Sequence, residues 1–290
     1  MKNIILICLV SILLSSCGPD PQNNHLTYQN IIIISDMSSR IDNKPTKDIK
    51  EIHKILQFFK EECVKPGEKI GDKSSICFST FSDKTIATID NETFNNLGDK
   101  QKFVNSTGKY KNSGLNSEID RFQKKVKKAY ANIRNKGLDL ISILIDKIEY
   151  EPIIKLSTFL TDGIDTTFIN YENHIYIFTD GYLEYLNKNA NKQFYFGDIE
   201  IKNVRQYCNK YKVGILEALE RNDKLCLPVY KSNNNQFINI HIMETHERDK
   251  NDRLQTYKYP KGQRDNEILE AVWRRWAIGS GFKSLSWDKY

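Results

Sequence analysis

The sequence lacks an apolar run long enough to cross a bilayer as a helix. Its charge-free apolar stretch near the start, residues 4–14, is shorter than the roughly 20 residues that a membrane-spanning helix needs. The sequence also has no Gly-x-Ser-x-Gly elbow, no glycine-rich phosphate loop and no Cys-x-x-Cys pair. These absences argue against an integral membrane protein, an elbow-type serine hydrolase, a phosphate-loop nucleotidase and a zinc-binding module.

The amino terminus instead reads as a cleaved secretory signal. Lys2 precedes the apolar residues 4–14, and the sequence Leu-Ser-Ser-Cys ends at Cys17. This segment resembles the lipobox of bacterial lipoproteins, which implies removal of residues 1–16 and lipid on Cys17, whose thiolate takes the diacylglyceryl group. A signal peptide with a chance cysteine is the alternative. By analogy with known sorting rules, Gly18 favours the outer membrane, facing the periplasm or the cell surface.

Charge and cysteine content set further bounds. The net charge is +6, and loss of Lys2 leaves 42 basic against 37 acidic residues, or +5. Because export separates the chain from most nucleic acid, we expect no nucleic-acid partner. Beyond the signal and Cys17 lie four cysteines, for which bridges and free thiols are both open, as are all three pairings. They are Cys63, Cys77, Cys208 and Cys226.

The alternation of apolar runs predicts an α/β fold. Short β-branched or aromatic runs predict buried strands, and apolar residues at helical spacing predict helices between them. We therefore expect a doubly wound, mainly parallel sheet with helices on both faces, in one domain over residues 30–290 after a lipidated tether over 17–29. The predicted strands are 31–34, 76–81, 175–178, 225–229 and 237–243. The predicted helices are 49–59, 117–135, 140–148, 203–220 and 267–278.

Two aspartates that directly follow predicted strands form the main candidate site. Asp36 follows the run of isoleucines and is followed by Ser38, while Asp180 ends the sequence Ile-Phe-Thr-Asp. This pattern resembles the von Willebrand factor A domain and its metal-ion-dependent adhesion site. The resemblance implies that Asp36, Ser38 and Asp180 hold Mg²⁺, an ion that prefers oxygen ligands. It further implies a binding module, not an enzyme, whose partner protein docks through an acidic side chain.

The sequence departs from that family at two places. Arg40 stands where the family has a second serine, and Asp139 is the nearest substitute for its loop threonine. Arg40 would then face the ligand, and it is also able to replace the metal by bridging Asp36 or Asp180. Capping of loops and helices by both aspartates is the simpler alternative. A metal-dependent hydrolase using the same aspartates and a structural lipoprotein with a vestigial site also remain open.

Overall fold

The computed structural model describes residues 23–37, 45–81, 85–131, 139–161, 165–185 and 192–290. The chain falls into two compact units. The smaller unit joins Ser157–Asn170 to the chain up to Thr27, and the larger one comprises Tyr28–Leu156 and Tyr171–Tyr290. Across the described ranges, no helix has both the length and the apolar character that a membrane crossing requires.

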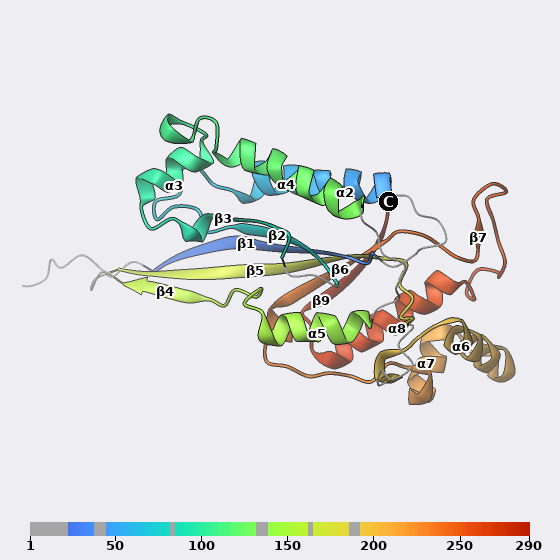
Figure 1. The fold of residues 1–290 in the computed structure, drawn as a ribbon. Coiled ribbons are helices and arrows are strands. Elements are labelled where there is room, and N and C mark those ends of the chain that lie inside the picture. Colours follow the sequence, from blue (N-terminus) through green and yellow to red (C-terminus); the bar gives the residue numbers. More distant parts are fainter. Residues whose placement is uncertain (1–22, 38–44, 82–84, 132–138, 162–164, 186–191) are drawn as a thin grey trace, which may run out of the picture. The chain divides into compact units, whose positions relative to one another are not determined.

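The larger unit is built on a mainly parallel sheet with the strand order β3-β2-β1-β5-β6-β9 (Figure 1). The pairs β1–β2, β5–β6 and β6–β9 are parallel, and β3 runs antiparallel to β2. The predicted α/β class is thus confirmed. The strands of this sheet are β1 (Asn23–Ser35), β2 (Ser75–Thr80), β3 (Ala87–Asp90), β5 (Thr166–Thr179), β6 (Ile238–Glu244) and β9 (Ser284–Lys289). The larger unit contains β1 from Tyr28 onward and β5 from Tyr171 onward.

Shorter strands lie outside this order. In the smaller unit, β4 (Thr158–Thr161) forms an antiparallel hairpin with the first part of β5. In the larger unit, β7 (Lys250–Asn251) and β8 (Thr256–Tyr257) form a two-stranded antiparallel ribbon.

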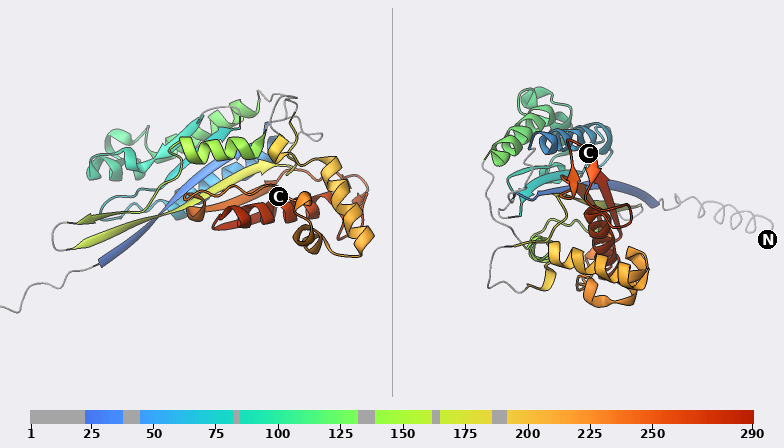
Figure 2. Two further views of the ribbon diagram at one scale, coloured as in Figure 1. Left: turned by 90° about the horizontal axis from the view of Figure 1, so that it is seen from below. Right: turned by 90° about the vertical axis from the view of Figure 1, so that its right-hand side faces the viewer.

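Helices cover both faces of the sheet in the larger unit. Figure 2 shows α2 and α4 on one face and α5 and α8 on the other. The α-helices are α2 (Pro45–Phe58), α3 (Leu97–Val104), α4 (Leu115–Tyr130), α5 (Leu140–Tyr150), α6 (Asp198–Tyr211), α7 (Ile215–Arg221) and α8 (Asp265–Ser280). A π-helical turn, Phe59–Cys63, continues α2, and the 3₁₀ turns are Asn91–Thr93, Gly108–Tyr110, Lys192–Phe194, Asp223–Leu225 and Asn235–Phe237.

The isoleucine run in β1 explains the two-layer core. Ile31 and Ile33 point to one cluster with α2 and α4, whereas Ile32 and Ile34 point to the other with α5 and α8. All four side chains are at most 1% exposed. Successive residues of a strand face opposite sides, so an uninterrupted apolar run fits a strand covered on both faces.

Two predicted elements differ from the structure. The helix expected over 203–220 is two helices, α6 and α7, because Lys212 between them takes a left-handed conformation with φ of 56°. The strand expected over 225–229 is absent. The segment begins with the last residue of a 3₁₀ turn, and Leu225 and Leu227 pack into the core without a strand partner. Pro228 has no N–H group that could donate a hydrogen bond to a neighbouring strand.

The boundaries of two predicted segments also differ from the structure, and one strand was missed. The strand β1 begins at Asn23, so residues 23–29 are strand where a tether was expected. Helix α8 runs through Gly279 and ends at Ser280, and the following Gly281 caps it with a φ of 88° that suits glycine. The edge strand β9 was not predicted at all.

The four cysteines of the domain are free thiols in the structure. Burial raises the pKa of Cys63 and of Cys77 to about 12. Burial also raises the pKa of Cys208 and Cys226. Because the thiolate is the reactive form, these side chains behave as small apolar groups of the core.

Candidate functional site at the carboxyl edge of the sheet

Asp36 and Asp180 meet at one edge of the sheet. Asp36 directly follows β1 and Asp180 directly follows β5, and these strands are neighbours. The Asp36 amide donates to the Phe178 carbonyl at 2.8 Å, and the Thr179 hydroxyl donates to Asp36 Oδ2 at 3.4 Å. Each aspartate is 4% exposed. The two carboxylates that the sequence singled out therefore share a buried position at the strand ends, where α/β sheets bind ligands.

The glycine after Asp180 shapes the turn that presents it. Gly181 has a φ of 83°, a conformation that other residues adopt at a cost. A Cβ atom there would lie 2.6 Å from the Trp287 ring, and the Gly181 carbonyl accepts a hydrogen bond from Trp273 Nε1 at 2.9 Å. The sequence Thr-Asp-Gly thus has a backbone explanation in addition to any role in binding.

An arginine from elsewhere in the chain neutralises Asp180. Arg248, four residues beyond the end of β6, donates from Nε to Asp180 Oδ2 at 2.9 Å and from Nη1 to Glu184 Oε2 at 2.6 Å. Its guanidinium carbon lies 3.7 Å from the centroid of the Tyr182 ring. One planar cation is therefore held by two carboxylates and an aromatic face.

The charges at this edge are strongly coupled. Burial raises the pKa of Asp180, Arg248 opposes that rise, and the nearby Asp36 adds to it. Burial alone would lower the pKa of Arg248, but Asp180 and Glu184 raise it above its ordinary value. The arginine is thus charged at any working pH, and it supplies the positive charge that a buried aspartate requires.

A third carboxylate lies on the neighbouring strand. Glu244 ends β6, opposite Thr179 on one side and Lys289 on the other. Its Oε2 accepts from Trp287 Nε1 at 3.0 Å and lies 3.5 Å from Lys289 Nζ, while Oε1 is buried with no partner among the described residues. Burial raises the pKa of Glu244 to about 7. This edge therefore carries a group that titrates near neutral pH.

A small polar pocket opens beside Glu244. Its volume is about 170 Å³. Three acidic and three basic side chains line it, so it carries no strong charge of one sign. The lining residues are Lys47, Glu244, Thr245, His246, Glu247, Lys250, Asp252, Lys289 and Tyr290.

The other residues predicted for the site are placed as follows. Ser38, Arg40 and the lipid-bearing Cys17 lie outside the described residues. Asp139 caps helix α5, where its Oδ1 accepts from the Ser142 amide at 3.1 Å and its Oδ2 from the Ser142 hydroxyl at 2.8 Å. Asp139 thus has a complete structural role at the start of the helix.

The described residues do not fit Mg²⁺ as they are arranged. Asp180 Oδ2 accepts from Arg248, and its Oδ1 accepts from the Tyr182 amide at 3.2 Å. A bound dication would stand beside a guanidinium, and within the described ranges no cluster of three or more His, Cys, Asp or Glu is arranged to hold a metal. The Mg²⁺ site stays a prediction that requires Arg248 to move away.

Sequence reasoning missed Arg248 and Glu184. Arg248 lies in a polar segment without periodicity, 68 residues from Asp180 along the chain, and Glu184 follows a predicted strand end without belonging to any motif. The sequence signal that a buried strand-end aspartate needs a cation was present, but it pointed to Arg40 because that residue is near in sequence.

No protein-family model matches the chain, and a search of curated proteins found no match either.

Proposed function

We propose that this protein is a membrane-anchored binding module, similar to a von Willebrand factor A domain, that docks a partner protein at the carboxyl edge of its sheet. The observation that carries the proposal is the meeting of Asp36 and Asp180 at the ends of neighbouring strands. In an open α/β sheet this edge is where loops from separate strands combine into one binding surface.

Arg248 gives this surface its chemistry. Its Nε and Nη1 are used by Asp180 and Glu184, while Nη2 donates no hydrogen bond within the described part of the chain. The side chain is 22% exposed. An acidic side chain of the partner therefore pairs with Nη2, in the role that the resemblance gives to a metal-bound carboxylate. Arg40, which the sequence places after Asp36, is proposed to face the same ligand.

The lipid on Cys17 is proposed to hold this domain at a membrane of the cell envelope. Several acyl chains on one residue anchor firmly, because each buried methylene contributes about 0.8 kcal/mol. The short polar sequence after Cys17 leaves little distance between the membrane and the domain, so the partner is expected to be another envelope protein.

Site-specific photo-crosslinking in the native envelope tests the docking surface. A photoreactive phenylalanine in place of Tyr185, next to Glu184, samples the proposed surface. The same group in place of Phe237, just before the amino end of β6 and 43% exposed, is the matched aromatic control. We expect one discrete crosslinked protein from position 185 and none from position 237.

The chemistry of the contact is tested in the same experiment. The crosslink at position 185 is expected to disappear in Arg248→Met and to persist in EDTA. Equal crosslinking from both positions would contradict the proposal. A crosslink that EDTA abolishes, and that Arg248→Met leaves intact, would favour the metal-dependent form of the site.

A further inference from the structure

A second pocket lies away from the carboxyl edge, near the amino end of β2 and beside Asn30 in the middle of β1. Its volume is about 540 Å³, within the range of small-molecule sites. The floor is the face of β2 and β3 that carries Cys77 and Thr88, which are paired across the two strands. One wall is the end of α5 and the residues that follow it, Tyr150 to Ile153.

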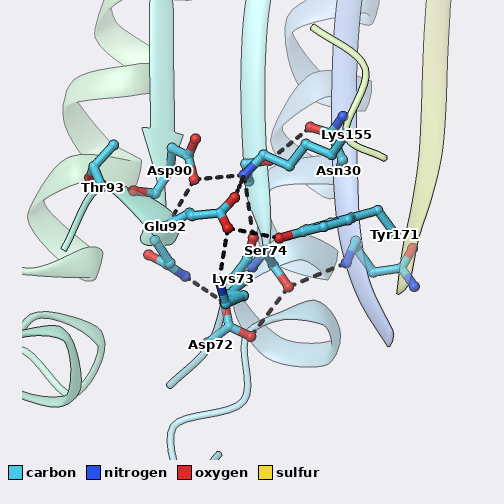
Figure 3. A network of polar contacts seen from close by, with 12 residues as sticks. Asn30, Asp72, Lys73, Ser74, Asp90, Glu92, Thr93, Lys155 and Tyr171 are labelled. Atoms are coloured by element: carbon cyan, nitrogen blue, oxygen red, sulfur yellow. Dashed lines mark hydrogen bonds and ion pairs between the residues drawn. The ribbon is translucent and has the colours of Figure 1, made fainter. Parts of the chain in front are cut away.

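A network of ion pairs fixes the polar end of this pocket (Figure 3). Lys155 Nζ donates to Asp90 Oδ1 at 2.9 Å and to Glu92 Oε2 at 3.1 Å. Lys73 Nζ and the Tyr171 hydroxyl each donate to Glu92 Oε1 at 2.9 Å. Partial burial alone would raise the pKa of Glu92, but the contacts with Lys73 and Lys155 lower it to about 2. Asp90 and Lys155 are therefore held in place before any ligand arrives.

The charges that line the pocket exclude an anionic ligand. Asp90 and Glu151 are both in the lining, and the ammonium of Lys155 already serves two carboxylates. The nearby Lys147 is paired with Glu151 at 3.2 Å. Both of these lysines thus have acidic partners, and the other polar groups among the described lining residues are mostly acceptors. Such a lining suits a neutral ligand that donates hydrogen bonds.

The remaining lining adds hydroxyl groups and one aromatic ring. Thr85 and Thr88 are exposed and present hydroxyls that both donate and accept. Tyr150 is 82% exposed, the highest value among the large hydrophobic side chains on the described surface. A solvated ring beside carboxylates and hydroxyls offers a flat apolar face to a ligand that is polar at its rim.

We propose that this pocket binds a saccharide. A pyranose ring has hydroxyls at its edge, which donate to Asp90 and Glu151 and exchange hydrogen bonds with Thr88. It also has an apolar face of C–H groups that packs on the Tyr150 ring. The volume accommodates a disaccharide. This site is separate from the carboxyl edge, so it stands or fails independently of the proposed partner docking.

Calorimetric titration of the full chain in detergent tests the assignment. The probes are N,N′-diacetylchitobiose, cellobiose and maltose, with spermidine as the cationic comparison. Thr88→Trp fills the pocket from an exposed strand position, and Thr256→Trp places the same side chain on an exposed position of β8. At least one disaccharide is expected to bind the wild type and Thr256→Trp but not Thr88→Trp.

Tyr150→Ala provides the second variant, because its side chain is exposed and outside the core. We expect it to weaken the same disaccharide by about three- to tenfold through loss of the aromatic face. Absence of binding by all three disaccharides would overturn the proposal, as would affinity unchanged in Thr88→Trp. Spermidine binding that Thr88→Trp abolishes, without any disaccharide binding, would assign the pocket to cations instead.

Discussion

At the scale of single residues, the site rests on the pairing of Asp180 with Arg248. A carboxylate that is 4% exposed has lost most of its hydration, and a fixed guanidinium at 2.9 Å replaces it. The pair gains specificity from Glu184 and the Tyr182 ring, which leave the guanidinium one orientation. Removing Arg248 leaves Asp180 as an uncompensated buried charge.

Arg248→Met is therefore expected to lower the free energy of unfolding by about 3–5 kcal/mol at neutral pH. The loss should shrink in acid, because burial raises the pKa of Asp180 and the unpaired carboxyl then takes up a proton. Denaturant unfolding over a pH series measures both effects. Arg221→Met, which breaks the exposed pair with Glu217, is the control, with an expected change below about 1 kcal/mol. A loss equal to that of the control would show that the buried pair contributes little.

Glu244 makes stability depend on pH in the opposite sense to most acids. The pKa of Glu244 is about 7 in the folded protein, whereas the ordinary value of a glutamate is 4.5. The folded state therefore binds the proton more tightly than the unfolded state does. The contribution of this group is fully present below pH 4.5 and is lost as pH rises through 7, by about 3 kcal/mol in total. Glu244→Gln keeps an acceptor for Trp287 and removes the titration.

The variant should thus match the wild type in acid and become the more stable protein at pH 8. Glu220→Gln, on the exposed surface of α7, is the control and should show a constant difference. A stability difference between wild type and Glu244→Gln that does not change with pH would contradict the account of this carboxyl.

At the scale of elements, three strands share a chain of hydrogen bonds on one face of the sheet. Ser286 donates to Asp288 Oδ2 at 2.7 Å, so its oxygen accepts from His241 Nδ1 at 2.9 Å. His241 Nε2 then accepts from His174 Nδ1 at 2.9 Å. This order assigns one neutral tautomer to each imidazole and links β5, β6 and β9.

Acid is expected to weaken this part of the sheet. Burial, with the neighbouring His174, lowers the pKa of His241 from 6.5 to about 4. Its contribution to stability is present above pH 6.5 and is lost as pH falls through 4, by about 3 kcal/mol. Hydrogen exchange of β6 and β9 amides over this range measures the loss. In His241→Gln the acid-dependent loss should shrink to the part that His174 contributes, because burial also lowers the pKa of His174. Equal acid sensitivity in both proteins would exclude His241 as the cause.

The elements also show what the sequence was able to predict. Strands buried on both faces, such as β1 with its isoleucines, can be predicted from their composition. The helices that cover them can be predicted from the spacing of their apolar residues. The strand β9 was not predicted because it lies at the sheet edge and its residues are partly exposed, so it has no continuous apolar run. The position of Asp180 at a strand end could be predicted from the local sequence. Its pairing with Arg248 could not, because a polar segment carries no pattern that shows which part of the fold it contacts.

At the scale of the whole molecule, the proposals describe a domain held to a membrane by lipid, with a partner surface at the carboxyl edge of the sheet. The family resemblance assigns the positive charge at that edge to a metal ion, whereas the described residues supply it from Arg248. These two versions differ in their response to divalent cations. If the cation is an arginine side chain of the protein, the stability of the protein does not depend on Mg²⁺. If the cation is a bound ion, the stability of the protein rises with the Mg²⁺ concentration.

Thermal unfolding during titration with MgCl₂ at constant ionic strength separates the two versions most directly. We expect the Tm of the wild type and of Asp36→Ala not to change with Mg²⁺, and the Tm of Arg248→Met to rise because the ion takes the vacated place beside Asp180. A wild-type Tm that rises with Mg²⁺, with the rise lost in Asp36→Ala, would contradict this expectation.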